Sequence, residues 1–195
     1  MSVRSEVRGS ARERLLAAAD ELFYEEGVRT VGIDRVIEHA GVAKASLYNT
    51  FGSKEALIRA YLDQRHERIT ARVAGHIARY DTPRERLLAV FEAQRELAEE
   101  QGFRGCAFVR ASAEAHAGDQ VEQASSDYRA WVRALFTDLA AQTGVADPVA
   151  LGRQMHLLYD GGSLSARMDH DPSAYTVSRS TAETLLDVAL AQSNR

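Results

Sequence analysis

The stretch IDRVIEHAGVAKASLYNTFGSK, residues 33–54, predicts two short helices joined by a tight turn, and it decides the fold. The apolar residues of the first helix share one buried face because they recur at i, i+3, i+4 and i+7: Ile33, Val36, Ile37 and Ala40. Gly41 ends this helix, since a glycine directly after the last periodic residue can adopt the left-handed conformation that closes a helix. A second helix follows at once, so the stretch is typical of a helix-turn-helix.

The second helix of this pair combines a small apolar side with a polar outer face. Leu47 and Phe51 are expected to face the core. The remaining side chains are small or hydrogen-bonding and are expected to point outward: Lys44, Ala45, Ser46, Tyr48, Asn49 and Thr50. In a helix-turn-helix, the second helix lies in the DNA major groove while the first crosses the backbone. The pattern therefore predicts double-stranded operator DNA as a partner.

Residues 40–57 carry the run A-G-V-x-K-x-S-L-Y-x-x-F-x-S-K-E-x-L, which resembles the DNA-binding pattern of the tetracycline-repressor (TetR-like) family of bacterial transcriptional regulators. The resemblance covers about the first quarter of the chain, and beyond it the family shares only a common all-helical plan. It implies contacts with DNA from the second helix and from the residues that flank the pair: Arg29, Thr30, Lys44, Ala45, Ser46, Tyr48, Asn49 and Lys54.

Lys54 is the expected phosphate contact. It follows Ser53, the expected N-cap of a long helix that runs toward Tyr80. A lysine in the first turn opposes the helix dipole, so an anionic partner such as a DNA phosphate is expected to offset it, with an ordinary solvated lysine as the alternative. The chain departs from the family pattern where Val31, Gly32 and Ala43 replace frequent hydroxyl-bearing residues. These changes remove hydroxyls expected for one N-cap and for one or two phosphate contacts, although Gly32 can itself cap a helix and Thr30 directly precedes Val31.

Composition favours an all-α fold. The chain has 195 residues, 45% of them apolar, only 3 Pro, and many Ala, Leu, Arg and Glu. We expect an N-terminal helix-turn-helix domain of three helices over residues 1–52 and a C-terminal helical domain for ligand binding and dimerisation over residues 53–195. The boundary is expected inside the long helix that starts near residue 53, so no flexible linker is needed.

Charge and targeting signals limit the class of protein further. The net charge is −4, which argues against a generally basic nucleic-acid coat protein but leaves room for a sequence-specific binder with a local positive face. The single cysteine cannot form an internal disulfide. Because the sequence has no signal peptide and no apolar run near 18 residues, we expect a cytoplasmic protein without a membrane partner.

Local capping and breaking signals predict the remaining helices. Ser10 and Glu13 have the spacing of a capping box and start the first helix. Later helices are expected over residues 83–100, 119–143 and 148–167 and after Pro172, with a short one ending near residues 116–118. The pair Gly161-Gly162 falls inside one of them, where each glycine costs about 1 kcal/mol relative to Ala, so a close helix approach or a kink is expected there.

The two C-terminal helices indicate a homodimer. They carry more apolar surface than one thin helical layer can bury, and the resemblance implies that they pair across a two-fold axis as a four-helix bundle. A homodimer would place two recognition helices on successive turns of the major groove. The operator should therefore be a near-palindrome.

The glycine-flanked segment of residues 103–109 is the most pocket-like part of the chain. The resemblance implies an internal pocket framed by the helices around it. We expect its wall to include aromatic residues, a thiol and an adaptable methionine: Phe91, Cys106, Phe108, Trp131, Met155 and Tyr159. Such a wall suits a small hydrophobic or aromatic effector that releases a repressor from DNA. Ordinary core packing is the alternative interpretation of each residue.

Other classes of protein have weaker support. No motif of a nucleotide-binding, hydrolytic or metallopeptidase site is present, so neither an enzyme nor a cofactor is expected. Metal binding is disfavoured at the best candidate group, where a helix face and a solvated turn explain the residues: His156, Asp160, Asp169, His170 and Asp171. Two alternatives stay open: a redox-sensing regulator that acts through Cys106, and a helical interaction module without DNA binding.

Overall fold

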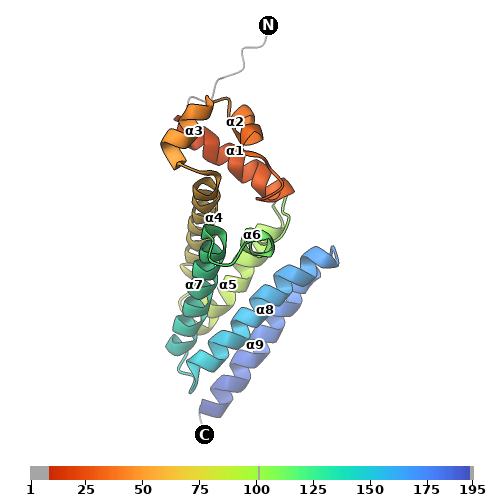
Figure 1. Cartoon of the computed structure of the whole chain (residues 1–195). Coiled ribbons are helices and arrows are strands. Elements are labelled where there is room, and N and C mark those ends of the chain that lie inside the picture. Colours follow the sequence, from red (N-terminus) through yellow and green to blue (C-terminus); the bar gives the residue numbers. More distant parts are fainter. Residues whose placement is uncertain (1–8, 101, 194–195) are drawn as a thin grey trace.

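The computed structural model describes residues 9–100 and 102–193, and over these residues it contains nine helices and no strand (Figure 1). The all-α fold predicted from the sequence is confirmed. The helices, in chain order, are α1 (Ala11–Glu26), α2 (Ile33–Ala40), α3 (Lys44–Phe51), α4 (Lys54–Ile77), α5 (Pro83–Ala98), α6 (Ala107–Glu114), α7 (Gln120–Gln142), α8 (Pro148–Met168) and α9 (Ser173–Ser193).

The first three helices pack together at one end of the molecule, beyond the start of α4 (Figure 1). The predicted capping box begins α1: the Glu13 N–H donates to Ser10 Oγ at 3.2 Å, and the Ser10 N–H donates to Glu13 Oε2 at 2.7 Å. The apolar stripe of α1 is buried: Leu15, Leu16, Ala19, Leu22 and Phe23. This stripe is the surface on which α2, α3 and the first turns of α4 pack.

Helix α4 connects this end of the molecule to the rest of the helices. Its N-cap is Ser53, as predicted, with the Ala56 N–H donating to Ser53 Oγ at 3.1 Å. Near its start, Tyr61 packs edge-on against Phe23 of α1 with 5.7 Å between ring centroids. The same 24-residue helix then packs against α5, α6 and α7. A movement of α4 would therefore displace its contacts with α1 and α3 as well as its contacts with α5, α6 and α7.

The remaining helix starts agree with the sequence signals. Thr82 caps α5 with Pro83 in its first turn, and Asp119 and Asp147 cap α7 and α8. Two helices end earlier than expected. Helix α5 ends at Ala98, before the positive φ of Gly102, and α6 ends at Glu114.

Helices α8 and α9 lie side by side along one flank of the molecule (Figure 1). Gly162 makes this approach possible, because a Cβ atom there would collide with the Ser178 side chain of α9. The expected close approach is thus confirmed for Gly162. Gly161 faces open space, and no contact explains it.

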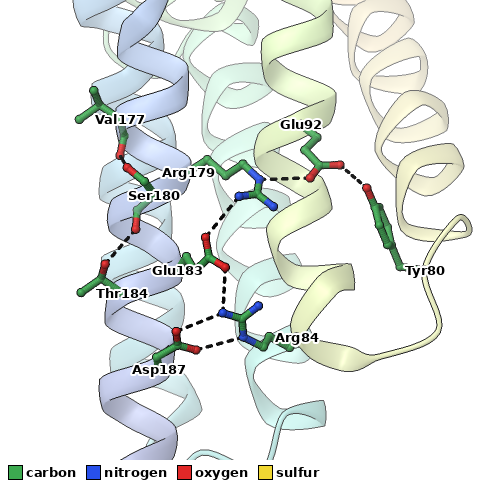
Figure 2. Close-up of polar contacts among 9 residues, drawn as sticks. All are labelled: Tyr80, Arg84, Glu92, Val177, Arg179, Ser180, Glu183, Thr184 and Asp187. Carbon is green, nitrogen blue, oxygen red and sulfur yellow. Dashed lines mark hydrogen bonds and ion pairs between the residues drawn. The ribbon is translucent and has the colours of Figure 1, made fainter.

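A polar network fixes α9 against α5 (Figure 2). Arg84 on α5 donates from Nε to Asp187 Oδ1 at 3.0 Å and from Nη2 to Glu183 Oε1 at 2.9 Å. About two turns further along the same helix, Glu92 accepts from Arg179 Nε at 3.1 Å and from the Tyr80 hydroxyl at 2.6 Å. The α9 face that carries these residues is therefore bound to α5 and is not available to a partner.

The other faces of α8 and α9 carry most of the exposed apolar surface. In the described part of the chain, eight large apolar side chains are exposed, and six of them lie on these two helices: Val149, Leu157, Leu164, Met168, Val177 and Val188. None of the described helices is long and apolar enough to cross a membrane.

Candidate nucleic-acid interface and internal cavity

The turn between α2 and α3 is fixed by backbone hydrogen bonds. Gly41 has φ +61°, the left-handed conformation predicted for it. Its N–H donates to Glu38 O at 3.1 Å, and the next N–H, of Val42, donates to Ile37 O at 3.3 Å. Arg14 of α1 also donates to Gly41 O at 3.1 Å. The angle between the two helices is therefore set by contacts within the protein.

Helix α3 presents the polar outer face that the sequence predicts. Leu47 is fully buried and holds the helix on the core, whereas Phe51 is half-buried. Of the residues expected to point outward, Ser46 is half-buried and the others are exposed: Lys44, Ala45, Tyr48, Asn49 and Thr50. These side chains line one accessible face of a short helix, which is the arrangement needed for reading base edges in a groove.

The N-termini of α2 and α3 have no side-chain cap. Gly32 and Ala43 occupy the cap positions, and neither offers a side-chain oxygen to the first N–H groups. The replacement of hydroxyl-bearing residues noted in the sequence therefore has the expected local result. Uncapped N–H groups at an exposed helix start can donate to an anion.

The chain contains only two lysines, and both lie in this region. Lys44 Nζ lies 2.8 Å from Asp34 Oδ1 on α2, and this hydrogen bond raises the pKa of Lys44. Lys54 lies at the start of α4, with Nζ 3.4 Å from Arg29 O, and partial burial of the ammonium lowers its pKa. A compact ammonium suits a phosphate oxygen as a point charge, whereas the arginines elsewhere in the chain pair mainly with carboxylates.

Arg29 turns away from the α3 face and binds α6 and the loop after it. Its N–H donates to Glu114 Oε2 and its Nε to Glu114 O, both at 2.8 Å, and its Nη2 lies 2.7 Å from Asp119 Oδ2. Gly27, with φ +102°, permits this contact because a Cβ there would be 2.6 Å from Glu114 Oε1. Thr30 is exposed beside it. The role of Arg29 visible in the structure is thus to join α6 to the segment before α2.

Tyr24 makes a second link between the first helix and the segment before α6. Its hydroxyl donates to Gly105 O at 2.9 Å and accepts from the Arg104 N–H at 2.8 Å. The guanidinium of Arg65 stacks on its ring at 3.8 Å from the centroid. Tyr24 therefore connects α1, α4 and the segment of residues 103–107.

Next to Tyr24, the structure contains a cavity of about 120 Å³ that is open to solvent on the side of Arg68 and Arg167. Contributions to its wall come from α1, from α4 to α8 and from the segment before α6. The wall is part apolar and part charged. It includes Ile69, Leu97, Phe103, Val109, Gln94, Tyr128, Tyr159, Asp160, Glu100, Arg65, Arg68, Arg72 and Arg167.

The cavity includes two of the six residues expected on a pocket. Cys106 and Tyr159 lie in its wall. The other four lie in the layer of packed side chains outside that wall. Phe108 stacks on Tyr128 at 3.9 Å, Trp131 packs against His66, Phe91 packs against Phe136, and Met155 is fully buried.

Sequence reasoning missed the arginines of the cavity. Arg65, Arg68 and Arg72 recur at i, i+3 and i+7 around Ile69, so they share one face of α4. Helical periodicity reveals charged faces as well as apolar ones. A face of arginines on a helix that packs against several other helices indicates a charged wall.

The structure also bears on the open alternatives. Burial raises the pKa of the Cys106 thiol, so the reactive thiolate is disfavoured. His156 Nε2 and Asp160 lie 3.4 Å apart, but Asp160 is bound to Arg129 at 2.7 Å. Within residues 9–100 and 102–193, no three His, Cys, Asp or Glu side chains are grouped closely enough to hold a metal ion.

An all-α protein with an exposed, polar second helix in a helix-turn-helix is a DNA-binding regulator by its fold and site. The family model for bacterial regulatory proteins of the tetR family matches residues 15–61. The chain is also similar to the crystal structure of a TetR-family transcriptional regulator from Streptomyces coelicolor, with 35% identity, a TM-score of 0.80, and coverage of 95% of this chain and 96% of that one. The chain belongs to the TetR family, whose members are transcriptional regulators rather than enzymes.

Curated relatives match over a shorter range. The transcriptional activator FasR of Mycolicibacterium smegmatis is 34% identical over 50% of this chain and 45% of its own length. The transcriptional repressor NemR of Escherichia coli is 32% identical over 53% of each chain. The chain thus spans about half the length of these two relatives in the matched region.

Proposed function

We propose that this regulator is a homodimeric repressor that a small molecule releases from a near-palindromic operator. Residues 1–52 form the DNA-binding domain and residues 53–195 form the domain for ligand binding and dimerisation, with the boundary at the start of α4. The observation that carries the proposal is the position of the cavity. One part of its wall, the segment of residues 103–107, is hydrogen-bonded to α1 through Tyr24.

The DNA contacts are assigned to the outer face of α3 and the start of α4. Lys44, Ala45, Ser46, Tyr48 and Asn49 would meet base edges or nearby phosphates, and Lys54 would bind a phosphate at each half-site. Thr30 would lie next to the backbone. Arg29 would act indirectly, because its guanidinium is bound to Glu114 and Asp119.

The exposed apolar side chains of α8 and α9 support the dimer. Six large apolar residues lie on these helices outside the network with α5, and a second copy of the same pair would cover them as a four-helix bundle. Two copies then present two α3 helices to one face of the DNA, which is why a near-palindrome is expected.

The effector would act by favouring a form in which the two α3 helices are badly spaced. Helix α4 and the Tyr24 link would carry a change at the cavity to α3. By thermodynamic linkage, DNA must weaken binding of the effector by the same factor as the effector weakens binding of DNA. Repression is proposed because a dimer that covers an operator excludes other proteins from it, and activation is the alternative outcome.

Selection of an operator from random duplex DNA tests this function. The expected result is one enriched near-palindrome that the dimer binds with nanomolar affinity at physiological salt. Expression of a reporter gene under the control of that operator should rise when the regulator is removed. Failure to enrich any sequence would overturn the DNA-binding proposal, and a reporter that falls would replace repression by activation.

A further inference from the structure

A buried hydrogen-bond acceptor lies in the cavity wall without a partner. Gln94 on α5 is only 6% exposed, and its Nε2 donates to Tyr159 O at 2.7 Å. This bond fixes the orientation of the amide, because only the nitrogen end can donate to a carbonyl. Within residues 9–100 and 102–193, Oε1 of Gln94 has no hydrogen-bond donor. A buried acceptor left in this state is costly, so the cavity favours an occupant that supplies a donor.

Two tyrosine hydroxyls line the same cavity. Tyr128 and Tyr159 are both buried, and their hydroxyl oxygens lie 3.2 Å apart. Burial raises both pKa values, so both groups stay protonated. Only one of the two protons is used between them, which leaves the other hydroxyl able to donate. An acceptor at Gln94 and a donor at the tyrosines together match a hydroxyl group, which can donate and accept at once.

The more exposed part of the wall is cationic. Arg65 and Arg68 share the carboxylate of Asp20, each at 2.6 Å, and Arg72 is bound by Glu96 and Glu100. Arg167 on α8 has no ion-pair or hydrogen-bond partner in the described part of the chain. The other acidic residue of the wall, Asp160, is neutralised by Arg129 at 2.7 Å.

Gly105 positions Arg167 against the cavity. This glycine has φ +89°, and a Cβ atom on it would lie 2.8 Å from Arg167 Cδ. The aliphatic part of Arg167 thus lies across the glycine, and its guanidinium remains beside a wall that already contains more arginines than carboxylates. Such a guanidinium is the group that binds a carboxylate in proteins.

The size of the cavity limits the occupant to about one ring. Its volume of about 120 Å³ is of the same order as a cavity of roughly 150 Å³ that accommodates benzene. Its apolar wall comes from Ile69, Leu97, Phe103 and Val109. A flat apolar ring fills such a space without leaving further polar groups unpaired.

We propose that the effector is a single-ring aromatic carboxylate with a hydroxyl group at the opposite end. The hydroxyl lies between Gln94 Oε1 and the tyrosine pair, the ring packs on the apolar wall, and the carboxylate binds Arg167 with Arg68 alongside. The inference rests on the proposed effector-controlled function and names the chemical class of the effector. It adds a hydroxyl group and a carboxylate to the small hydrophobic or aromatic effector expected from the sequence.

Four matched compounds test the proposal on the unchanged protein by isothermal titration calorimetry. They are 4-hydroxyphenylacetate, phenylacetate without the hydroxyl, tyrosol with an alcohol in place of the carboxylate, and tyramine with an ammonium. The first should bind tightest. Loss of the hydroxyl or of the carboxylate should weaken binding roughly tenfold or more, since each removes the partner of a buried or charged group.

Two variants assign these preferences to residues. Arg167→Gln should weaken binding of 4-hydroxyphenylacetate roughly tenfold and bring it close to tyrosol. Gln94→Met should reduce the preference for 4-hydroxyphenylacetate over phenylacetate, because the effector hydroxyl loses its acceptor and keeps only the tyrosine donor. Arg133→Gln is the matched control, because this exposed arginine of α7 lies outside the cavity wall and should leave all four affinities unchanged.

The outcomes separate this inference from the proposed function. If tyrosol, tyramine or phenylacetate binds as tightly as 4-hydroxyphenylacetate, or if none of the four binds at millimolar concentration, the proposed class of effector is wrong. If a neutral compound releases the protein from operator DNA, the proposed class of effector is wrong, but the proposed function as an effector-controlled regulator stands. Binding of 4-hydroxyphenylacetate without any change in operator affinity would support the class and contradict control by this cavity.

Discussion

The outer face of α3 and the cavity behind α4 are built in opposite ways. The α3 face comes from six of seven neighbouring helix positions, residues 44–46 and 48–50, and its side chains are exposed or half-buried. The cavity wall comes from seven separate parts of the chain, and its polar groups are mostly paired with one another. The first surface can be read from local periodicity, whereas the second exists only after the helices have packed.

Because of this difference, the two regions recognise their partners in different ways. Exposed groups on α3 exchange water for DNA at contact, so their contribution depends on salt and on the duplex sequence. Buried groups of the cavity have already lost their water, so an unpartnered atom such as Gln94 Oε1 discriminates strongly between ligands. Perturbing one region should therefore leave the other largely intact, except through α4, Tyr24 and the bonds of Arg29 to α6 and the loop after it.

Breaking the dimer is expected to give the largest difference between the effect on DNA binding and the effect on ligand binding to the cavity. Leu157 on α8 is 71% exposed, and Leu157→Glu would place a charge in the proposed apolar interface, where its burial is costly. Light scattering should show a monomer, and operator affinity should fall more than about a hundredfold because one half-site contact is lost. Binding to the cavity should change little. Ala134→Glu on the exposed side of α7 is the control, and a Leu157→Glu protein that remains a dimer would contradict the assignment of the interface.

A smaller effect, confined to the DNA side, is expected from the two lysines. Lys54→Ala should weaken binding to all duplexes alike, by roughly tenfold, and should reduce the salt slope by about one for each half-site. Lys44→Ala should instead change which operator is preferred. Fluorescence anisotropy at several salt concentrations measures both. An unchanged slope for Lys54→Ala would show that this ammonium does not bind a phosphate.

Removing a single oxygen atom should weaken the link between the α3 face and the cavity. Tyr24→Phe removes the hydroxyl that joins α1 to Gly105 and Arg104 but keeps the ring under Arg65. Operator affinity without ligand should change little. The ratio of operator affinities with and without a cavity ligand should fall by several-fold, since each lost hydrogen bond contributes about 1 kcal/mol.

Tyr80→Phe is the matched control for this prediction. It also loses one hydroxyl, which donates to Glu92 in the network between α5 and α9, away from Tyr24 (Figure 2). The coupling ratio should stay at the parent value in this variant. If Tyr24→Phe keeps the same coupling as well, the connection runs through α4 or through the bonds of Arg29 to Glu114 and Asp119.

The sequence predicted the parts of the fold that depend on neighbouring residues. The caps at Ser10 and Ser53, and the left-handed turn at Gly41, are local in origin and are all confirmed. Family resemblance added the regulator class, which the comparisons confirm. The assignments of individual DNA contacts remain predictions.

The cavity could be predicted only in part because its wall depends on the order and angle of helix packing. Phe108 and Trp131 have the composition of pocket residues, yet they pack with Tyr128 and His66 outside the wall. Arg167 reaches the wall because Gly105 has no side chain, a relation between residues 62 positions apart that no local pattern reveals. The same reasoning applies to Arg29, whose partners lie on α6 and in the loop after it.

The smallest expected effect concerns stability at the junction of α4, α6 and α7. His66 packs edge-on against Phe108, Tyr128 and Trp131, with ring centroids 6.2, 5.5 and 5.0 Å away. Burial lowers its pKa in the folded protein. The nearby carboxylates of Asp63 and Asp127 oppose this shift, and Arg59, which is paired with both, adds to it.

The sign of the pH effect follows from the lowered pKa of His66. Below about pH 6.5, the usual pKa of a histidine side chain, the unfolded chain binds a proton that the folded protein does not yet accept, so the free energy of unfolding falls as the pH is lowered. His66→Phe keeps the edge-on packing and removes this proton. Urea unfolding of both proteins measures the difference between their free energies of unfolding. Between pH 7 and pH 5 this difference should change in favour of the variant, because only the parent protein loses stability through His66. The shift should be less than about 1 kcal/mol because solvent reaches part of the ring. Between pH 7 and pH 8 the difference should be constant, and a constant difference down to pH 5 would mean that the aromatic neighbours do not exclude the charged imidazole.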